Sequence, residues 1–331
     1  MTFKSNLDLL NACDDFPLAQ KDLAKYTETV NRYYHFKAAS VPATLGLVIP
    51  SVAQVFGKYP GWTVDEGSTP KTLILTGSHD ETSRSKLVAE TLQQMRSESE
   101  FDVLKKWRNE LKPSYGPSGE LLFSMERAAV PLLGLVAYGI HMVAYTRPDP
   151  NEEPQIWISK RSKKVKIYPG YLDNTVAGGI STGETPYDSL IREAHEEASL
   201  PSYLVRRKVK SCGTLSYFHI RNAKAGGEVG LLQLDIHFLF EIELPTDVKL
   251  ALCDDEVEWY QLWTVDQVKD GLAAGQFKPN FALVMLDFFI RHGILNELNE
   301  PNFVEISARL HRVLEFPVDG ATSSKGLQAK V

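Results

Sequence analysis

Residues 178–200 read GGISTGETPYDSLIREAHEEASL, and they hold the strongest structural signal in the chain. Thr185 suits a helix N-cap, Pro186 suits the first turn and Pro201 would stop the helix, so the sequence predicts a helix over 186–198. At about 100° per residue, the apolar side chains of this helix share one arc that can pack on a sheet. That arc comprises Tyr187, Leu190, Ile191, Ala194 and Ala198.

Three glutamates, Glu193, Glu196 and Glu197, lie on the neighbouring arc of the same helix. Carboxylates placed so closely repel one another unless water screens them or a cation binds them. A ligand set made only of oxygens suits Mg²⁺ or Mn²⁺ better than zinc. The alternative is a solvated acidic helix face. The glycine-rich loop ahead of the helix favours the cation, because glycine lets the backbone approach a phosphate group closely.

The spacing of these residues matches the Nudix box, which runs Gly, five residues, Glu, seven residues, Arg-Glu, an apolar residue, any residue and Glu-Glu. The chain therefore resembles Nudix hydrolases at Gly178, Glu184, Arg192, Glu193, Glu196 and Glu197. Ser199 stands where the family has a glycine, which usually adopts the left-handed conformation that ends the helix. This departure leaves the position of the helix end open.

The resemblance implies a fold and a chemistry. The fold is an α/β/α sandwich with a mixed sheet, and the chemistry is attack of water on a diphosphate linkage, with Mg²⁺ or alternatively Mn²⁺ holding the phosphates. Glu193 and Glu197 are then metal ligands together with Gly178, and Glu196 is a third ligand or an acid–base group. An ion pair between Glu184 and Arg192 would order the loop.

The resemblance extends beyond the box to WISKRSKKVKIYPGYLDNTVAGGI, residues 157–180, and to a preceding domain of more than a hundred residues. These features are similar to the Nudix group related to the extra domain of some fungal thiamine pyrophosphokinases. The similarity implies hydrolysis of oxidised, damaged forms of thiamine diphosphate to the monophosphates.

Two further segments carry candidate site residues. Lys160, Arg161 and Lys164 belong to a basic segment that ends at Lys166, and they could bind the phosphates. Glu256, with Glu258 as the alternative, precedes or begins a late strand and could supply a catalytic base or a further metal ligand. For each residue taken alone, a solvated surface charge is the competing interpretation.

Three other functions compete with this interpretation. Isopentenyl diphosphate isomerases share the fold but rely on a cysteine shortly after a threonine, and the run after Thr175 contains none. A non-catalytic Nudix-fold binding module typically loses the carboxylates that this box keeps. A hydrolase of a nucleoside diphosphate derivative is compatible with the box.

The composition of the chain is ordinary for a soluble globular protein. The 331 residues are 43% hydrophobic and 24% charged, with a net charge of −6, which does not favour nucleic-acid binding. Acidic residues in the first 15 positions argue against a secretory signal, and we expect a cytoplasmic protein with no membrane span. The sequence leaves the oligomeric state open.

The predicted organisation is a mixed α/β N-terminal domain over 1–130, the Nudix domain over 131–295, and a helix with a flexible tail over 296–331. Patterning predicts helices over 83–97, 101–111, 266–274 and 281–292, and strands over 133–145, 155–162, 231–244 and 257–265. The Pro- and Gly-rich run 112–119 predicts a loop at or near the domain boundary.

Overall fold

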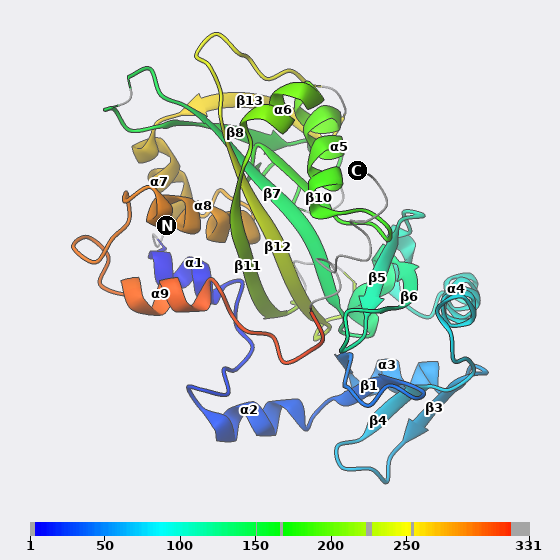
Figure 1. The fold of residues 1–331 in the computed structure, drawn as a ribbon. Coiled ribbons are helices and arrows are strands. Elements are labelled where there is room, and N and C mark those ends of the chain that lie inside the picture. Colours follow the sequence, from blue (N-terminus) through cyan, green and yellow to red (C-terminus); the bar gives the residue numbers. More distant parts are fainter. Residues whose placement is uncertain (1–3, 150, 166–167, 223–226, 253–254, 319–331) are drawn as a thin grey trace.

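The box lies against a mixed seven-stranded sheet at the centre of the C-terminal part (Figure 1). The structure is a computed structural model that describes residues 4–149, 151–165, 168–222, 227–252 and 255–318. The main strand order is β11-β12-β7-β8-β13, with β10 paired to β7 and β9 paired to β8. Strands β12 and β7 run parallel, and the other pairs of this sheet are antiparallel. The strands are β7 (Val136–Thr146), β8 (Gln155–Arg161), β9 (Leu172–Asp173), β10 (Val176–Gly179), β11 (Lys210–Ile220), β12 (Leu232–Glu243) and β13 (Val257–Trp263).

Helices cover both faces of this sheet. Because side chains of a strand alternate between faces, β7 sends Ile140 and Met142 into one core and Val143 and Tyr145 into another. The first core is closed by α5 and α6, and the second by α1, α7, α8 and α9. This arrangement confirms the α/β/α sandwich. The helices are α1 (Asn6–Asn11), α5 (Pro186–Ala198), α6 (Ser202–Lys208), α7 (Val265–Ala273), α8 (Pro279–Arg291) and α9 (Phe303–Arg309).

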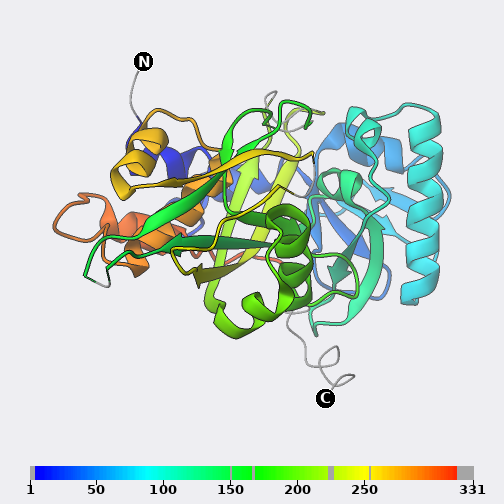
Figure 2. The same cartoon turned by 90° about the horizontal axis from the view of Figure 1, so that it is seen from above.

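The N-terminal part has its own mixed sheet, in the order β2-β1-β4-β3, followed by the hairpin β5-β6. Its apolar core includes Phe36 and Leu73 from the sheet, Phe56 from α3 and Leu92 from α4. It lies beside the sandwich in Figure 2. Its elements are α2 (Leu23–Val30), β1 (Tyr34–Ala38), β2 (Gly46–Val48), α3 (Pro50–Phe56), β3 (Trp62–Asp65), β4 (Thr72–Leu75), α4 (Glu81–Ser97), η1 (Asp102–Lys106), β5 (Leu111–Tyr115), β6 (Leu121–Glu126) and η2 (Arg127–Leu132).

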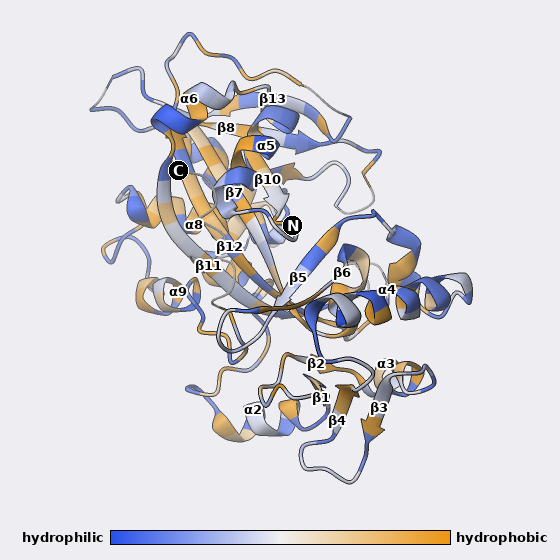
Figure 3. Ribbon diagram, turned by 45° about the vertical axis from the view of Figure 1, so that its right-hand side comes forward, coloured by the Kyte–Doolittle hydropathy of each residue, from blue (hydrophilic) through white to orange (hydrophobic). Residues whose placement is uncertain are grey.

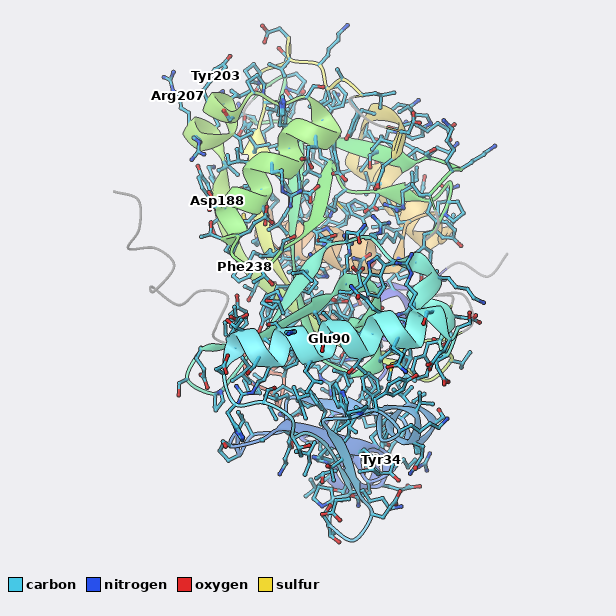
Figure 4. The ribbon with its side chains drawn as sticks, turned by 90° about the vertical axis from the view of Figure 1, so that its right-hand side faces the viewer. Tyr34, Glu90, Asp188, Tyr203, Arg207 and Phe238 are labelled. Atoms are coloured by element: carbon cyan, nitrogen blue, oxygen red, sulfur yellow. The ribbon has the colours of Figure 1, made fainter. Side chains whose placement is uncertain are left out.

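Helix α4 packs one face on the core of this N-terminal part and exposes polar residues on the other. In Figure 3 it carries hydrophilic residues together with a few hydrophobic ones, and Val88, Leu92 and Met95 are buried. In Figure 4 the same helix, labelled at Glu90, crosses between Asp188 on α5 and Tyr34 on β1. An amphipathic helix of this kind is expected where one face covers a core.

Two local predictions were wrong. Residues 101–111 do not form an α-helix: a short 3₁₀ helix, η1, is followed by strand β5, because Leu111–Tyr115 pairs with Leu121–Glu126. The run 112–119 is therefore a strand and a tight turn rather than a loop between domains. Gly119, with a φ of 75°, sits in that turn.

The other predicted strands and helices are confirmed within a few residues. The uncharged run before Tyr145 forms the buried strand β7. Among the described residues, no helix is long and apolar enough to span a membrane. The division at 130 and 295 stays a prediction, and residues 319–331 of the expected tail lie outside the described residues. Helix α1 packs with α8 and α9 in one core, so the first residues join the C-terminal helices.

Candidate active site

Helix α5 begins and ends where the box predicts. The Thr185 side chain accepts a hydrogen bond from the Asp188 backbone N–H at 3.1 Å, which caps the helix. At the other end Ser199 adopts the left-handed conformation, with φ 53° and ψ 25°, and the Leu200 N–H donates to the Ala194 carbonyl. The serine thus adopts the conformation usual for the family's glycine, at a cost of about 1–2 kcal/mol.

The loop ahead of α5 is tied to the helix through Glu184. Arg192 donates two hydrogen bonds to this carboxylate, from Nε to Oε1 at 2.8 Å and from Nη2 to Oε2 at 3.0 Å. The Ser181 N–H and the Ser189 hydroxyl donate to the same side chain. Burial raises the pKa of Glu184, but these partners outweigh burial and lower it. The carboxylate therefore stays charged and orders the loop.

Glu193 and Glu197 both lie against strand β10. The Ala177 N–H donates to Glu197 Oε2 at 2.9 Å. A Cβ on Gly178 would lie 2.1 Å from Glu193 Oε1, so only glycine leaves room for this carboxylate. Glu196 is more exposed, and Arg192 bridges it to Glu193 at 3.1 and 2.8 Å. The predicted helix thus brings its three glutamates to one edge of the sheet.

Negative charge exceeds positive charge at this edge, and such an excess favours the binding of a cation. Burial raises the pKa of Glu193 and the charge of Glu196 adds to the effect, while Arg192 acts in the opposite direction. Within the described ranges, no three Asp, Glu, His or Cys side chains already converge closely enough to hold a metal. The donors present are nevertheless hard oxygen ligands, and the space at Gly178 seats one of them. This set fits a divalent cation of the Mg²⁺ type.

A cavity of about 290 Å³ opens beside the Gly178–Gly179 edge. Its wall combines residues from the N-terminal part, among them Lys112 and Arg127, with His141 and His237 from the central sheet. Burial lowers the pKa of both histidines. They are therefore neutral at pH 7, and the Nδ1 atom of buried His237 has no hydrogen-bond partner among the described residues.

The structure places the basic candidates outside this wall. Arg161 pairs with buried Asp173 at 2.9 Å, Lys160 with Glu258 at 3.4 Å, and Lys164 with Asp255 at 3.2 Å. Of the residues that the structure describes, the cavity lining includes none of these three cations. Their phosphate-binding role stays a prediction, and Lys166 lies outside the described residues.

Glu256 lies in the loop before β13, where its carboxylate faces Arg108 of the N-terminal part at 3.8 Å. Its side chain is 48% exposed. Its proposed role as a base, like that of Glu258, stays a prediction.

Sequence reasoning missed Lys112 and Arg127, which reach the box from the other part of the chain. Lys112 lies in the run that was interpreted as a loop, and Arg127 begins η2 after the hairpin. Neither belongs to a motif, so only the fold could bring them to Gly179.

Comparisons with known proteins agree with this geometry. Residues 24–137 match a family described as "Domain of unknown function (DUF4743)", and residues 142–282 match the NUDIX domain. The chain is 33% identical over 244 residues to the Saccharomyces cerevisiae "Uncharacterized protein YJR142W", covering 72% of this chain and 71% of that protein.

A plant protein and a solved structure show further similarities. "Nudix hydrolase 20, chloroplastic" of Arabidopsis thaliana is 36% identical over 57% of this chain, which spans about half of that relative (48%). A solved structure, DR0079 from Deinococcus radiodurans, aligns with 54% of this chain and 99% of its own at 17% identity and a TM-score of 0.40. The assignment of the family rests on the sequence matches.

The chain contains a Nudix domain over residues 142–282 and is similar to named Nudix hydrolases of plants. It is therefore an enzyme of the phosphoanhydride hydrolase class. Nudix hydrolases generally use divalent metal ions, which the carboxylate edge described above can accommodate.

Proposed function

We propose that this protein hydrolyses the phosphoanhydride bond of a small organic diphosphate in a reaction that needs a divalent cation, Mg²⁺ or Mn²⁺. The observation that carries the proposal is the seating of Glu193 and Glu197 on the β10 edge, directly beside a cavity. Strand β10 thus contacts both glutamates and lines the cavity through Ala177, Gly178 and Gly179, while the described lining itself contains no glutamate of the box. That combination is the ordinary form of a small-molecule site.

Each box residue has a distinct proposed task. Glu193, Glu197 and Gly178 would hold the cation, which when bound would neutralise phosphate charge and activate water. Glu196, more exposed at 53%, is free to act as a further ligand or to accept a proton from water. Arg192 and Glu184 keep the loop and helix in fixed relation. Glu256 is the alternative proton acceptor.

For the substrate we propose oxidised thiamine diphosphates, converted to the monophosphates. The support is the extended resemblance over residues 157–180 together with two properties of the cavity. At about 290 Å³ it is near the small end of ligand pockets, which favours a compact ring system over a dinucleotide. Its neutral His237 offers a polar atom to an uncharged, carbonyl-bearing ring. A site with such a group can discriminate strongly, because the wrong ligand leaves the group unpaired.

The test is a panel of organic diphosphates incubated with purified protein and Mg²⁺ in ¹⁸O-labelled water. Mass spectrometry then identifies each monophosphate and shows which product carries the label. We expect damaged thiamine diphosphates to exceed intact thiamine diphosphate in kcat/KM. A preference of orders of magnitude for ADP-ribose or another nucleotide would overturn the substrate while keeping the hydrolase.

The non-catalytic alternative has its own outcome. A binding module would bind a diphosphate with micromolar affinity and release no product from any member of the panel. The retained carboxylates argue against it, because non-catalytic modules of this fold typically lose them.

A further inference from the structure

A second charged cluster reaches the box from the N-terminal part. Its centre is Glu110, which accepts hydrogen bonds from Lys112, from Arg127 at 2.8 Å and from the Ser181 hydroxyl at 3.2 Å. The loop of the box also meets this part through its backbone, since the Thr182 N–H donates to the Leu111 carbonyl at 2.9 Å. The hairpin β5-β6 is thus docked on the box loop itself.

Lys112 is held in one place by this docking. Only 5% of its side chain is exposed, and its Nζ donates to the Ile180 carbonyl at 2.9 Å as well as to Glu110. A Cβ on Gly179 would lie 2.4 Å from Nζ, so the second glycine of the box makes room for this ammonium. An ammonium has three donors, and one remains beyond the two partners named.

Arg127 stands beside Lys112 at the same edge. Its guanidinium carbon lies 3.6 Å from the position of a Gly179 Cβ, and its side chain is 42% exposed. Both cations line the cavity next to Gly178 and Gly179. Both cations share the carboxylate of Glu110, and both also interact electrostatically with glutamates of the box, Arg127 with Glu193 and Lys112 with Glu184.

We propose that Lys112 and Arg127 bind the diphosphate oxygens of the substrate, so that the N-terminal part completes the active site. The inference rests on the proposed function of the box. A diphosphate brings several negative charges next to carboxylates, and cations fixed beforehand reduce that repulsion. The planar guanidinium of Arg127 can bind two phosphate oxygens at once, whereas Lys112 acts as a point charge.

The structure favours these two cations over the basic segment that sequence reasoning singled out. Arg161, Lys160 and Lys164 pair with Asp173, Glu258 and Asp255, and they lie outside the described lining of the cavity. Lys112 and Arg127 share Glu110 and both line the cavity. Cations in the wall of the cavity are the better place for an incoming anion.

The experiment measures binding of methylenediphosphonate, a diphosphate mimic that cannot be hydrolysed, by calorimetry in the presence of Ca²⁺. We expect Arg127→Met to weaken binding roughly tenfold, since charged hydrogen bonds are lost, and Arg127→Lys to recover part of the loss. Lys112→Met should weaken it at least as much. The matched control is Lys86→Met, a lysine on α4 that pairs with Glu90 and is 76% exposed.

Unfolding in urea shows whether each variant is folded. If Lys112→Met does not fold, the half-exposed Arg127 carries the test alone. In kinetics, loss of a phosphate contact should raise KM or lower kcat/KM, and Arg127→Lys should restore it in part. Unchanged affinity in folded Arg127→Met, within twofold of wild type, would overturn the inference. A wild-type protein that hydrolyses no member of the panel would instead overturn the proposed function.

Discussion

Two charge clusters of this molecule differ in their partners. At the box, Glu184, Glu193 and Glu196 pair with the single guanidinium of Arg192, and Glu197 of the same helix accepts a hydrogen bond from the Ala177 N–H. In the second cluster, which we call the terminal clasp, Asp14 meets Arg309 at 3.1 Å and Arg312 at 2.9 Å. The box has an excess of carboxylates near a cavity, whereas in the clasp the two arginines meet Asp14 and Glu305 and also donate to backbone carbonyls.

The guanidinium donors of the clasp bind groups inside the protein. Arg312 also donates to the carbonyls of Phe16 and Pro17 at 2.7 and 2.8 Å, and its guanidinium lies over the Phe218 ring at 5.2 Å. Asp14 accepts from the Phe218 N–H. The cluster therefore joins the first residues, strand β11 and the segment after α9. The comparison shows two uses of charge. Carboxylates without enough cations, near a cavity, indicate a site for a ligand, whereas guanidinium groups bound to backbone carbonyls hold distant segments of the chain together.

The largest expected effect breaks the box. Glu197→Gln removes a charge with little change in shape, and the amide oxygen can still accept from Ala177. We expect kcat/KM to fall by about 10²–10³-fold, because a metal ligand is weakened, while the protein stays folded. Relief of carboxylate repulsion should leave the melting temperature equal or higher. Near-wild-type turnover in steady-state kinetics would remove Glu197 from the metal site.

The next largest effect is expected from a substitution that disrupts the clasp. Arg312→Met leaves the fully buried Asp14 with Arg309 as its remaining cation and frees two backbone carbonyls. Loss of one partner of a buried pair costs about 3–5 kcal/mol, so the urea midpoint should fall clearly. As a matched control, Arg32→Met disrupts an exposed pair with Glu28 of α2 and should change stability by less than about 0.5 kcal/mol. Equal effects of the two variants would mean that the clasp is not structural.

The same contrast explains what the sequence could predict. The box is local: its helix, cap and carboxylates lie within about two dozen residues, so spacing alone places them. The clasp joins residues almost three hundred positions apart, and no pattern in Asp14 or Arg312 points to the other. Lys112 was missed for the same reason, because its partner Ile180 lies 68 residues away.

Local signals also failed where pairing outweighed propensity. The segment 101–111 has apolar residues at helical spacing, yet Leu111 is drawn into strand β5 by its pairing with Glu126. The prolines and glycines after it correctly indicate a turn, but they gave no indication of strand β5, which precedes that turn. Tertiary pairing, which a single sequence does not display, decides such segments.

A smaller effect is expected for Glu110, whose carboxylate pairs with two cations as that of Asp14 does in the clasp. Burial raises its pKa, but Arg127 and Lys112 outweigh burial and lower it to about 2, below the ordinary 4.5. The folded carboxylate thus stays charged, and its contribution is fully present above pH 4.5 and is lost as the pH falls toward 2. Glu110→Gln should lose about 1–2 kcal/mol at pH 7, allowing for its 24% exposure.

Urea unfolding at pH 7, 4 and 3 follows this difference between wild type and Glu110→Gln. Because glutamine does not titrate, the gap should narrow at pH 4 and narrow further at pH 3. A gap that is constant from pH 7 to pH 3 would show that the charge of Glu110 is not what stabilises the docking of β5 on the box loop.

The smallest expected effect concerns the end of the box helix. Ser199 has a φ of 53°, a conformation that costs a residue with a Cβ about 1–2 kcal/mol and glycine almost nothing. Glycine gives back part of that gain through its freer unfolded chain, so Ser199→Gly should stabilise the protein by roughly 0.5 kcal/mol. Ser199→Ala is the matched control, because it removes the hydroxyl and keeps the strain. Urea unfolding should then rank glycine above serine, with alanine no better than serine; stabilisation by alanine as well would assign the effect to the hydroxyl rather than to the left-handed backbone.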